Sequence, residues 1–288
     1  MKRRALVWAG LTLLLTTGVI MAVPLSRDMV MGYVNREAFV EGRPTRYWIG
    51  ALKSSDASQR RHAALVLGEP AHFDSHPADD SHTKAVLGSL CDAFSDPDVE
   101  VRKSAALSLL SCKESIGAHS NLPTAPLVAG LKDRDDTVRK VAAELLGRLG
   151  PEARGAVEAL TASLKDKLAA VREDSAKALG EIGTDAKGSV PALLVTLDDE
   201  DREVREQSAK SLGILGPLAD RSLAKGIVAS LAKHLKDEEG DVRMHSARSL
   251  GRMGAEAKVA IPALKEATKD GDERVRKEAS QTLAKLPT

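Results

Sequence analysis

Residues 204–212 read Val-Arg-Glu-Gln-Ser-Ala-Lys-Ser-Leu, and this stretch decides the fold because six other stretches of the chain repeat its pattern. Counted from the arginine, small residues stand at offsets +3 and +4, leucine at +7, and valine at −1 in six of the seven copies. These offsets draw a single apolar stripe along a helix. The small pair lets a neighbouring helix approach closely. The seven arginines are Arg60, Arg102, Arg139, Arg172, Arg205, Arg243 and Arg276.

A second apolar stripe precedes each of these helices. In the copy around Arg205 it includes Leu193 and Leu197, eight residues before the arginine, and a run of four acidic residues, 198–201, separates the two stripes. Glycine follows the second stripe, as at Gly183 and Gly216, and glycine is a common helix stop. Each unit is therefore predicted to be helix, tight acidic turn, helix and glycine break. Because one helical hairpin cannot bury its stripe alone, the units are expected to stack.

The composition agrees with packed helices and excludes other classes of fold. Apolar residues make up 43% of the 288 residues, mostly as Ala, Leu and Val, while aromatic residues make up only 2%. A β-sandwich or β-barrel needs more β-branched and aromatic side chains. The 42 basic and 41 acidic residues leave a net charge of +1, which argues against a nucleic-acid partner.

The repeat resembles the HEAT repeat family, in particular its short bacterial, HEAT-like or lyase-type form, over about Thr45 to Leu286. The resemblance implies an all-α fold, a right-handed α-solenoid of about seven stacked helical hairpins. In this family an acid of the inter-helix turn bonds the arginine of a neighbouring unit. The resemblance implies a ladder of such bonds, made by the acids four residues before the arginines. Leu168 replaces the acid in the fourth unit, so the ladder is expected to be interrupted there. Those acids are Asp56, Asp98, Asp135, Asp201 and Asp272, with Glu239 in the sixth unit.

The N-terminus predicts a membrane anchor. Three basic residues, 2–4, precede an uncharged and mostly apolar run at residues 5–23, which is long enough to cross a bilayer as a helix. The basic flank then places the solenoid on the extracytoplasmic, periplasmic side. A cleaved signal peptide, which leaves the chain secreted, and a buried helix are the alternatives. The predicted segments are the anchor at 1–23, a stalk at 24–43 and the solenoid at 44–288.

Two groups of residues with possible chemistry are expected to be structural or solvated. His72, His76 and His82 lie in the longest insertion, residues 69–83, and are candidate metal ligands. Their spacing fits no defined motif, so a solvated polar loop is the favoured interpretation. Cys91 and Cys112 are expected to be too far apart along the hairpin for a disulfide and to lie buried as thiols.

The predicted function is a non-enzymatic protein-interaction scaffold without a cofactor or a small-molecule substrate. A protein partner is expected along the inner face of the solenoid, which the second helices line. The alternative is a HEAT-like enzyme, similar to bilin lyases or to metal-dependent hydroxylases, whose repeated His-Glu pairs are absent from this sequence. The exposed positions of the second helices vary in charge, which suits a protein partner. The candidates for partner binding are Arg61, Lys103, Lys140, Glu173, Glu206 and Lys277.

Overall fold

A computed structural model describes residues 29, 31, 32, 39–69, 81–112, 116 and 122–286. The chain divides into two compact units, Met1–Ser115 (unit 1) and Ile116–Thr288 (unit 2). The described part is a mostly helical repeat solenoid, as predicted, in which a first helix and a second helix alternate. The boundaries predicted at residues 23 and 43 and the right-handed sense stay predictions.

Unit 1 holds two helical pairs and a short hairpin in its described residues. The strands β1 (Phe39–Val40) and β2 (Arg43–Pro44) pair antiparallel and precede the first pair. Trp48, which is 6% exposed, donates a hydrogen bond from its indole nitrogen to the carbonyl of Val40 and so joins the hairpin to the first helix. The pairs are α3 (Thr45–Ala51) with α4 (Ala57–Leu67), and α5 (Ser81–Asp92), extended by η3 (Ala93–Ser95), with α6 (Val99–Ser111).

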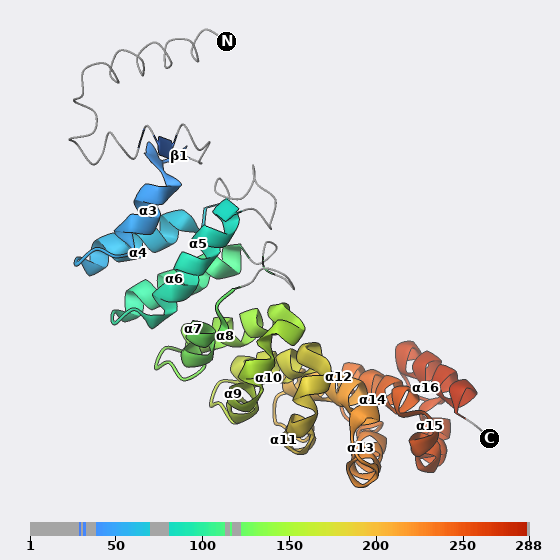
Figure 1. Ribbon diagram of the computed structural model, residues 1–288. Coiled ribbons are helices and arrows are strands. Elements are labelled where there is room, and N and C mark those ends of the chain that lie inside the picture. The colour runs from blue at the N-terminus through green and yellow to red at the C-terminus, as the bar shows by residue number, and fades with distance from the viewer. Residues whose placement is uncertain are drawn as a thin grey trace, which may run out of the picture. The chain divides into compact units, whose positions relative to one another are not determined.

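Unit 2 holds five helical pairs, and Figure 1 shows its first and second helices as two layers. Short 3₁₀ segments link the successive pairs. The pairs are α7 (Thr124–Gly130) with α8 (Asp136–Leu149), α9 (Val157–Ser163) with α10 (Ala169–Ile182), α11 (Val190–Thr196) with α12 (Arg202–Leu215), α13 (Arg221–His234) with α14 (Gly240–Met253), and α15 (Ile261–Ala267) with α16 (Glu273–Lys285). The links are η5 (Gly150–Ala156), η6 (Gly183–Ser189), η7 (Gly216–Leu218) and η8 (Gly254–Ala260).

Local chemistry explains where the helices begin and end. The aspartate at offset −4 accepts hydrogen bonds from backbone N–H groups of the first turn, as Asp201 does from Glu203 and Val204. Such a cap satisfies donors that have no partner within the helix. At the other end, Gly150, Gly183 and Gly254 adopt positive φ angles of 54°, 77° and 57°, a conformation that a side chain disfavours. The capping aspartates are Asp56, Asp98, Asp135, Asp201 and Asp272.

The core follows the apolar stripe of the repeat. The leucine at offset +7 is fully buried in the first six copies, from Leu67 to Leu250, and so is one small residue of each +3/+4 pair in unit 2, such as Ala209. Successive second helices pack against each other at a second small contact. Glycine at offset +8 of one helix meets the residue at offset +6 of the next, as Gly213 of α12 meets Ser249 of α14. A Cβ atom on Gly213 would lie 2.6 Å from the Cβ of Ser249.

This glycine contact stops at the edges of each unit. The last second helix of each unit has a larger residue at offset +8, Leu110 in α6 and Ala284 in α16. The first second helix has a large residue at offset +6, Val66 in α4 and Leu145 in α8. Within each unit, glycine stands at offset +8 of every second helix that another second helix of that unit follows. The two units are therefore visible in the pattern at offsets +6 and +8.

The localisation predicted from residues 5–23 is contradicted. The longest helices in the described part of the chain have 14 residues, whereas about 20 apolar residues are needed to span a bilayer. Among the described residues, no helix is long and apolar enough to cross a membrane. The segment 5–23 itself, with the anchor, signal-peptide and buried-helix interpretations, lies outside the described residues.

The two cysteines are free and buried, as predicted. Burial raises the pKa of each thiol to about 12. Both thiols are therefore protonated at neutral pH and poorly reactive.

Candidate protein-binding site

The seven arginines of the repeat brace their own turns. In each copy Nη1 donates to the backbone carbonyls at offsets −6 and −5, as Arg205 does to Asp199 at 3.0 Å and Glu200 at 3.1 Å. The same two bonds recur at Arg60, Arg102, Arg139, Arg172, Arg243 and Arg276. These contacts fix the tight turn between the two helices of one pair.

The acid that bonds an arginine of the neighbouring pair differs from the acid predicted. The structure places it at offset −6, two residues before the predicted position, because the aspartate at −4 is turned toward its own helix as the N-cap. Nε and Nη2 of Arg205 donate to the two carboxylate oxygens of Asp237 at 2.9 and 3.0 Å. Equivalent bidentate pairs join Arg60 to Asp96, Arg139 to Asp166, Arg172 to Asp199 and Arg243 to Asp270.

The interruption expected at Leu168 is absent for the same reason. Leu168 replaces the N-cap, while the bridging acid of that unit is Asp166, which pairs with Arg139. Ser54 stands at offset −6 in the first pair, where no described pair precedes it, and its hydroxyl accepts the backbone N–H of Asp56 as the aspartates do elsewhere. The hydrogen bond from Arg243 holds the pKa of Asp270 below its usual range. The arginines and aspartates of the ladder are thus engaged in structural hydrogen bonds.

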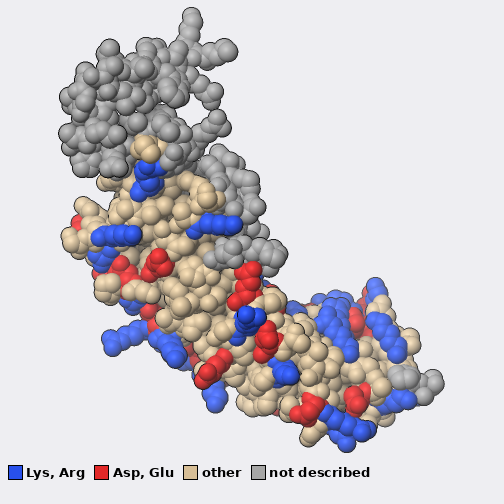
Figure 2. Space-filling model, in the orientation of Figure 1, with Lys and Arg blue, Asp and Glu red and all other residues tan. Residues whose placement is uncertain are grey.

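The exposed surface of the second helices, called here the second-helix face, carries offsets +1, +2 and +5. All six predicted partner-binding residues lie on it at offset +1, one on each of α4, α6, α8, α10, α12 and α16. Arg61, Lys140 and Lys277 are exposed. Lys103 pairs with Glu100 at 3.1 Å, and Glu206 pairs with Lys210 four residues on. Figure 2 shows charges of both signs side by side over unit 2 rather than one continuous field.

Asp174 is the least satisfied group of this face, and sequence reasoning did not single it out. It lies at offset +2 on α10, and its Oδ2 atom is buried with no hydrogen-bond partner among the described residues. Burial, together with the negative charges of Glu173 and Glu144, raises the pKa of Asp174 to about 7, against the opposing effect of Lys140 and Lys177. Burial also raises the pKa of Glu173. The second-helix face at α10 therefore holds carboxylates whose negative charge is not fully compensated.

Replacing Asp174 with asparagine is expected to stabilise the protein above pH 7. The folded-state pKa lies above the value of 3.8 for the free group, so the stability that the proton contributes is present below pH 4 and lost as the pH rises through 7. Urea unfolding at pH 4 and pH 8 should give D174N an advantage of about 1–2 kcal/mol at the higher pH, allowing for partial solvent screening, and little at the lower. The exposed Asp185→Asn variant is the control, and an equal advantage at both pH values would contradict the prediction.

Of the three histidines proposed as metal ligands, the structure describes His82. His72 and His76 lie outside the described residues. His82, on α5, has Nε2 3.4 Å from the hydroxyl of Thr45. Among the described residues no group of three His, Cys, Asp or Glu side chains has an arrangement suited to a metal ion.

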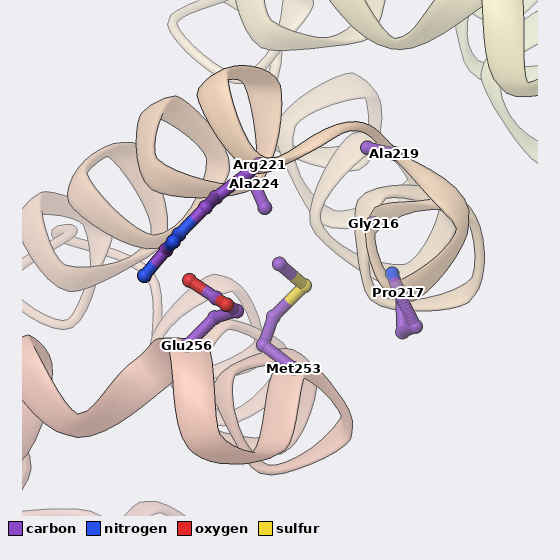
Figure 3. Close-up of a pocket in the computed structure, with 7 residues that line it drawn as sticks. All are labelled: Gly216, Pro217, Ala219, Arg221, Ala224, Met253 and Glu256. Carbon is purple, nitrogen blue, oxygen red and sulfur yellow. The ribbon is translucent and has the colours of Figure 1, made fainter.

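A hollow of about 400 Å³ lies where the link after α12 departs from the others. The links η5, η6 and η8 have seven residues, whereas η7 has three and leads into a longer first helix, α13. Figure 3 shows Met253 projecting between the end of α12 and the start of α13, with Arg221 and Glu256 beside it. The hollow is open to solvent and follows from the irregular link. We assign it no ligand.

The fold and the bonded ladder define a class of protein, the α-helical repeat proteins. Residues 124–213 match the family model of HEAT repeats, and residues 242–270 match the model described as PBS lyase HEAT-like repeat. These two parts of the chain therefore carry HEAT repeats. No curated protein matches it.

Solved structures with this fold include engineered and designed repeat proteins. An engineered protein is 25% identical over 92% of this chain and 72% of its own, with a TM-score of 0.67. A designed armadillo repeat protein is 19% identical, with a TM-score of 0.56 over 70% of this chain and 100% of its own. Another designed armadillo repeat protein, in complex with the peptide (KR)4, is 19% identical over 70% of this chain and 99% of its own, with a TM-score of 0.58. These three likenesses concern the fold.

Proposed function

We propose that this chain is a non-enzymatic scaffold that binds a protein partner on its second-helix face. The observation that carries the proposal is the contrast between repeated, buried positions and variable, exposed positions along the second helices. From α6 to α14, offsets −1, +3, +4 and +7 repeat and are buried. Offset +1 is exposed or partly exposed and changes from Arg61 to Glu173 to Lys277. A surface that changes from repeat to repeat distinguishes one partner sequence from another.

The known repeat structures support the same function. One of the designed armadillo repeat proteins similar in fold was solved with a bound peptide. Stacked helical pairs present a continuous surface of rigid helices, and a site built on helices is better ordered than one on loops. The alternative, a HEAT-like enzyme, stays a prediction, and the bonded arginines and aspartates of the ladder give it no support.

Site-specific cross-linking tests this proposal. A photo-reactive amino acid is placed at Lys140 or Lys177 on the second helices, and as a control at the exposed Lys225 of the first helix α13. In the cell that produces the protein, the second-helix positions are expected to yield one defined cross-linked protein, identified by mass spectrometry, which Lys225 does not yield. The same products from all three positions, or none from any, would contradict the proposal.

A further inference from the structure

Two leucines are exposed in register on the second-helix face of unit 1. Leu65 of α4 is 43% exposed and Leu107 of α6 is 47% exposed. Both stand at offset +5, so they occupy the same place on neighbouring second helices. α4 and α6 pack against each other in unit 1, and packed helices lie about 8–10 Å apart. The two side chains therefore form an apolar pair across the helices rather than isolated exposed residues.

The fold does not require leucine at this place. In the five second helices of unit 2, the same offset carries charged or polar side chains without any change in the packing of the repeat. These residues are Glu144, Lys177, Lys210, Arg248 and Gln281. Since the position faces solvent in a helix of the same kind, leucine there leaves nearly half of its surface unfavourably exposed to water.

Basic side chains lie beside the leucines, one helical turn before them. Arg61 precedes Leu65 by four residues and Lys103 precedes Leu107 by four, so each base and leucine share one side of their helix. Arg61 is exposed, and no acidic partner for it is present among the described residues. The pair of Lys103 with Glu100 is a partly exposed contact at i, i+3, which a partner displaces at little cost.

We propose that Leu65 and Leu107, with Arg61 and Lys103, bind a protein segment that presents apolar side chains beside carboxylates. This inference rests on the proposed function and names the chemistry of the partner on unit 1. The apolar side chains of the segment cover the two leucines, and its Asp or Glu residues pair with the two bases. A basic segment is repelled by the bases, and a polar acidic segment leaves the leucines in water.

Selection from a display library of random linear peptides on the immobilised full-length protein tests the inference. The binding of each enriched peptide to the wild type and to the variants is then measured by fluorescence anisotropy. Glutamine is chosen because it stands at this offset in α16 as Gln281. We expect enriched peptides with apolar residues beside Asp or Glu, and at least about tenfold weaker binding to L65Q/L107Q and to R61E/K103E. The control V195Q, at an exposed valine of α11, should bind as the wild type does.

Each other outcome overturns the inference. Selected peptides that are basic, or that bind L65Q/L107Q as tightly as the wild type, exclude the proposed chemistry. Binding only after residues 1–38 are removed means that this chain covers its own leucines. A dimer that L65Q/L107Q abolishes, seen by light scattering, assigns the leucines to a second copy. If no peptide requires Leu65 and Leu107 but others require Lys177 and Lys210 of unit 2, the inference fails while the proposed function stands.

Discussion

Replacing Arg205 with alanine is expected to lower the free energy of unfolding by about 3–5 kcal/mol. Arg205 and Asp237 form the most buried pair of the ladder, with side chains 8% and 7% exposed. The substitution removes two bonds to Asp237 and two to the turn carbonyls of Asp199 and Glu200, and leaves a buried carboxylate without its partner. An unpaired buried charge costs much more than an exposed one. Urea unfolding of the full chain, followed by circular dichroism, measures the loss.

Two other arginines supply controls for this result. Arg202 pairs with Glu203 on the surface, where its side chain is 62% exposed, so R202A should leave the unfolding free energy nearly unchanged. Arg276 braces its own turn as Arg205 does, but it has no ion pair with an acid in the described structure. R276A should therefore cost less than R205A. If R205A and R202A are equally stable, the ladder does not hold the pairs of helices together.

Replacing Gly213 with alanine is expected to lower the unfolding free energy by about 2–3 kcal/mol, although alanine is the better helix former. The added Cβ would lie 2.2 Å from the hydroxyl oxygen of Ser249 and 3.0 Å from its Cα, so the backbone of α14 has to shift. The shift also disturbs the hydrogen bond of 2.7 Å that the Ser249 hydroxyl donates to the carbonyl of Ala209. Thermal and urea unfolding of the variant measure the effect.

Gly226 provides a matched control within the same unit. It lies inside α13 and is exposed, and a Cβ there would meet only the side chain of Leu194 at 4.0 Å. Gly226→Ala should therefore stabilise the protein slightly, by up to about 1 kcal/mol. Adding Ser249→Gly to Gly213→Ala removes the colliding side chain and should restore part of the loss. Equal effects of the two glycine substitutions would show that close helix approach is not what Gly213 provides.

Sequence reasoning predicted that acids and arginines form the ladder, but it did not identify the bridging acid. The repeated arginine and the acidic turn were both visible in the sequence. The family resemblance implied that they join neighbouring helical pairs. Two offsets, −4 and −6, are acidic in nearly every copy. The identity of the bridging acid depends on the direction of each carboxylate at the turn. Asp201 turns to the N–H groups of its own helix, and Asp199, two residues earlier, lies against Arg172.

The second-helix face shows a similar limit to sequence reasoning. The sequence placed six variable residues at offset +1, and the structure puts all six on the exposed side of the second helices. Sequence reasoning did not single out Asp174, because its pKa depends on burial and on the charges of neighbouring side chains. Nor did it distinguish the leucines at offset +5, since leucine is also the usual core residue of these helices and only solvent exposure separates Leu65 from Leu67.

By itself, the sequence determined the helical pair, its repetition and the buried stripe, because helix periodicity, capping and glycine stops act over a few residues along the chain. It led to a wrong localisation, since the described helices are too short and polar to cross a membrane. Only the tertiary structure decided which acid pairs with which arginine and which leucine meets water. It also decided where the small contacts of the second helices stop. These properties depend on distances between residues that lie far apart in the sequence, 27 to 36 positions in the ladder, and the packing of the helical pairs sets these distances.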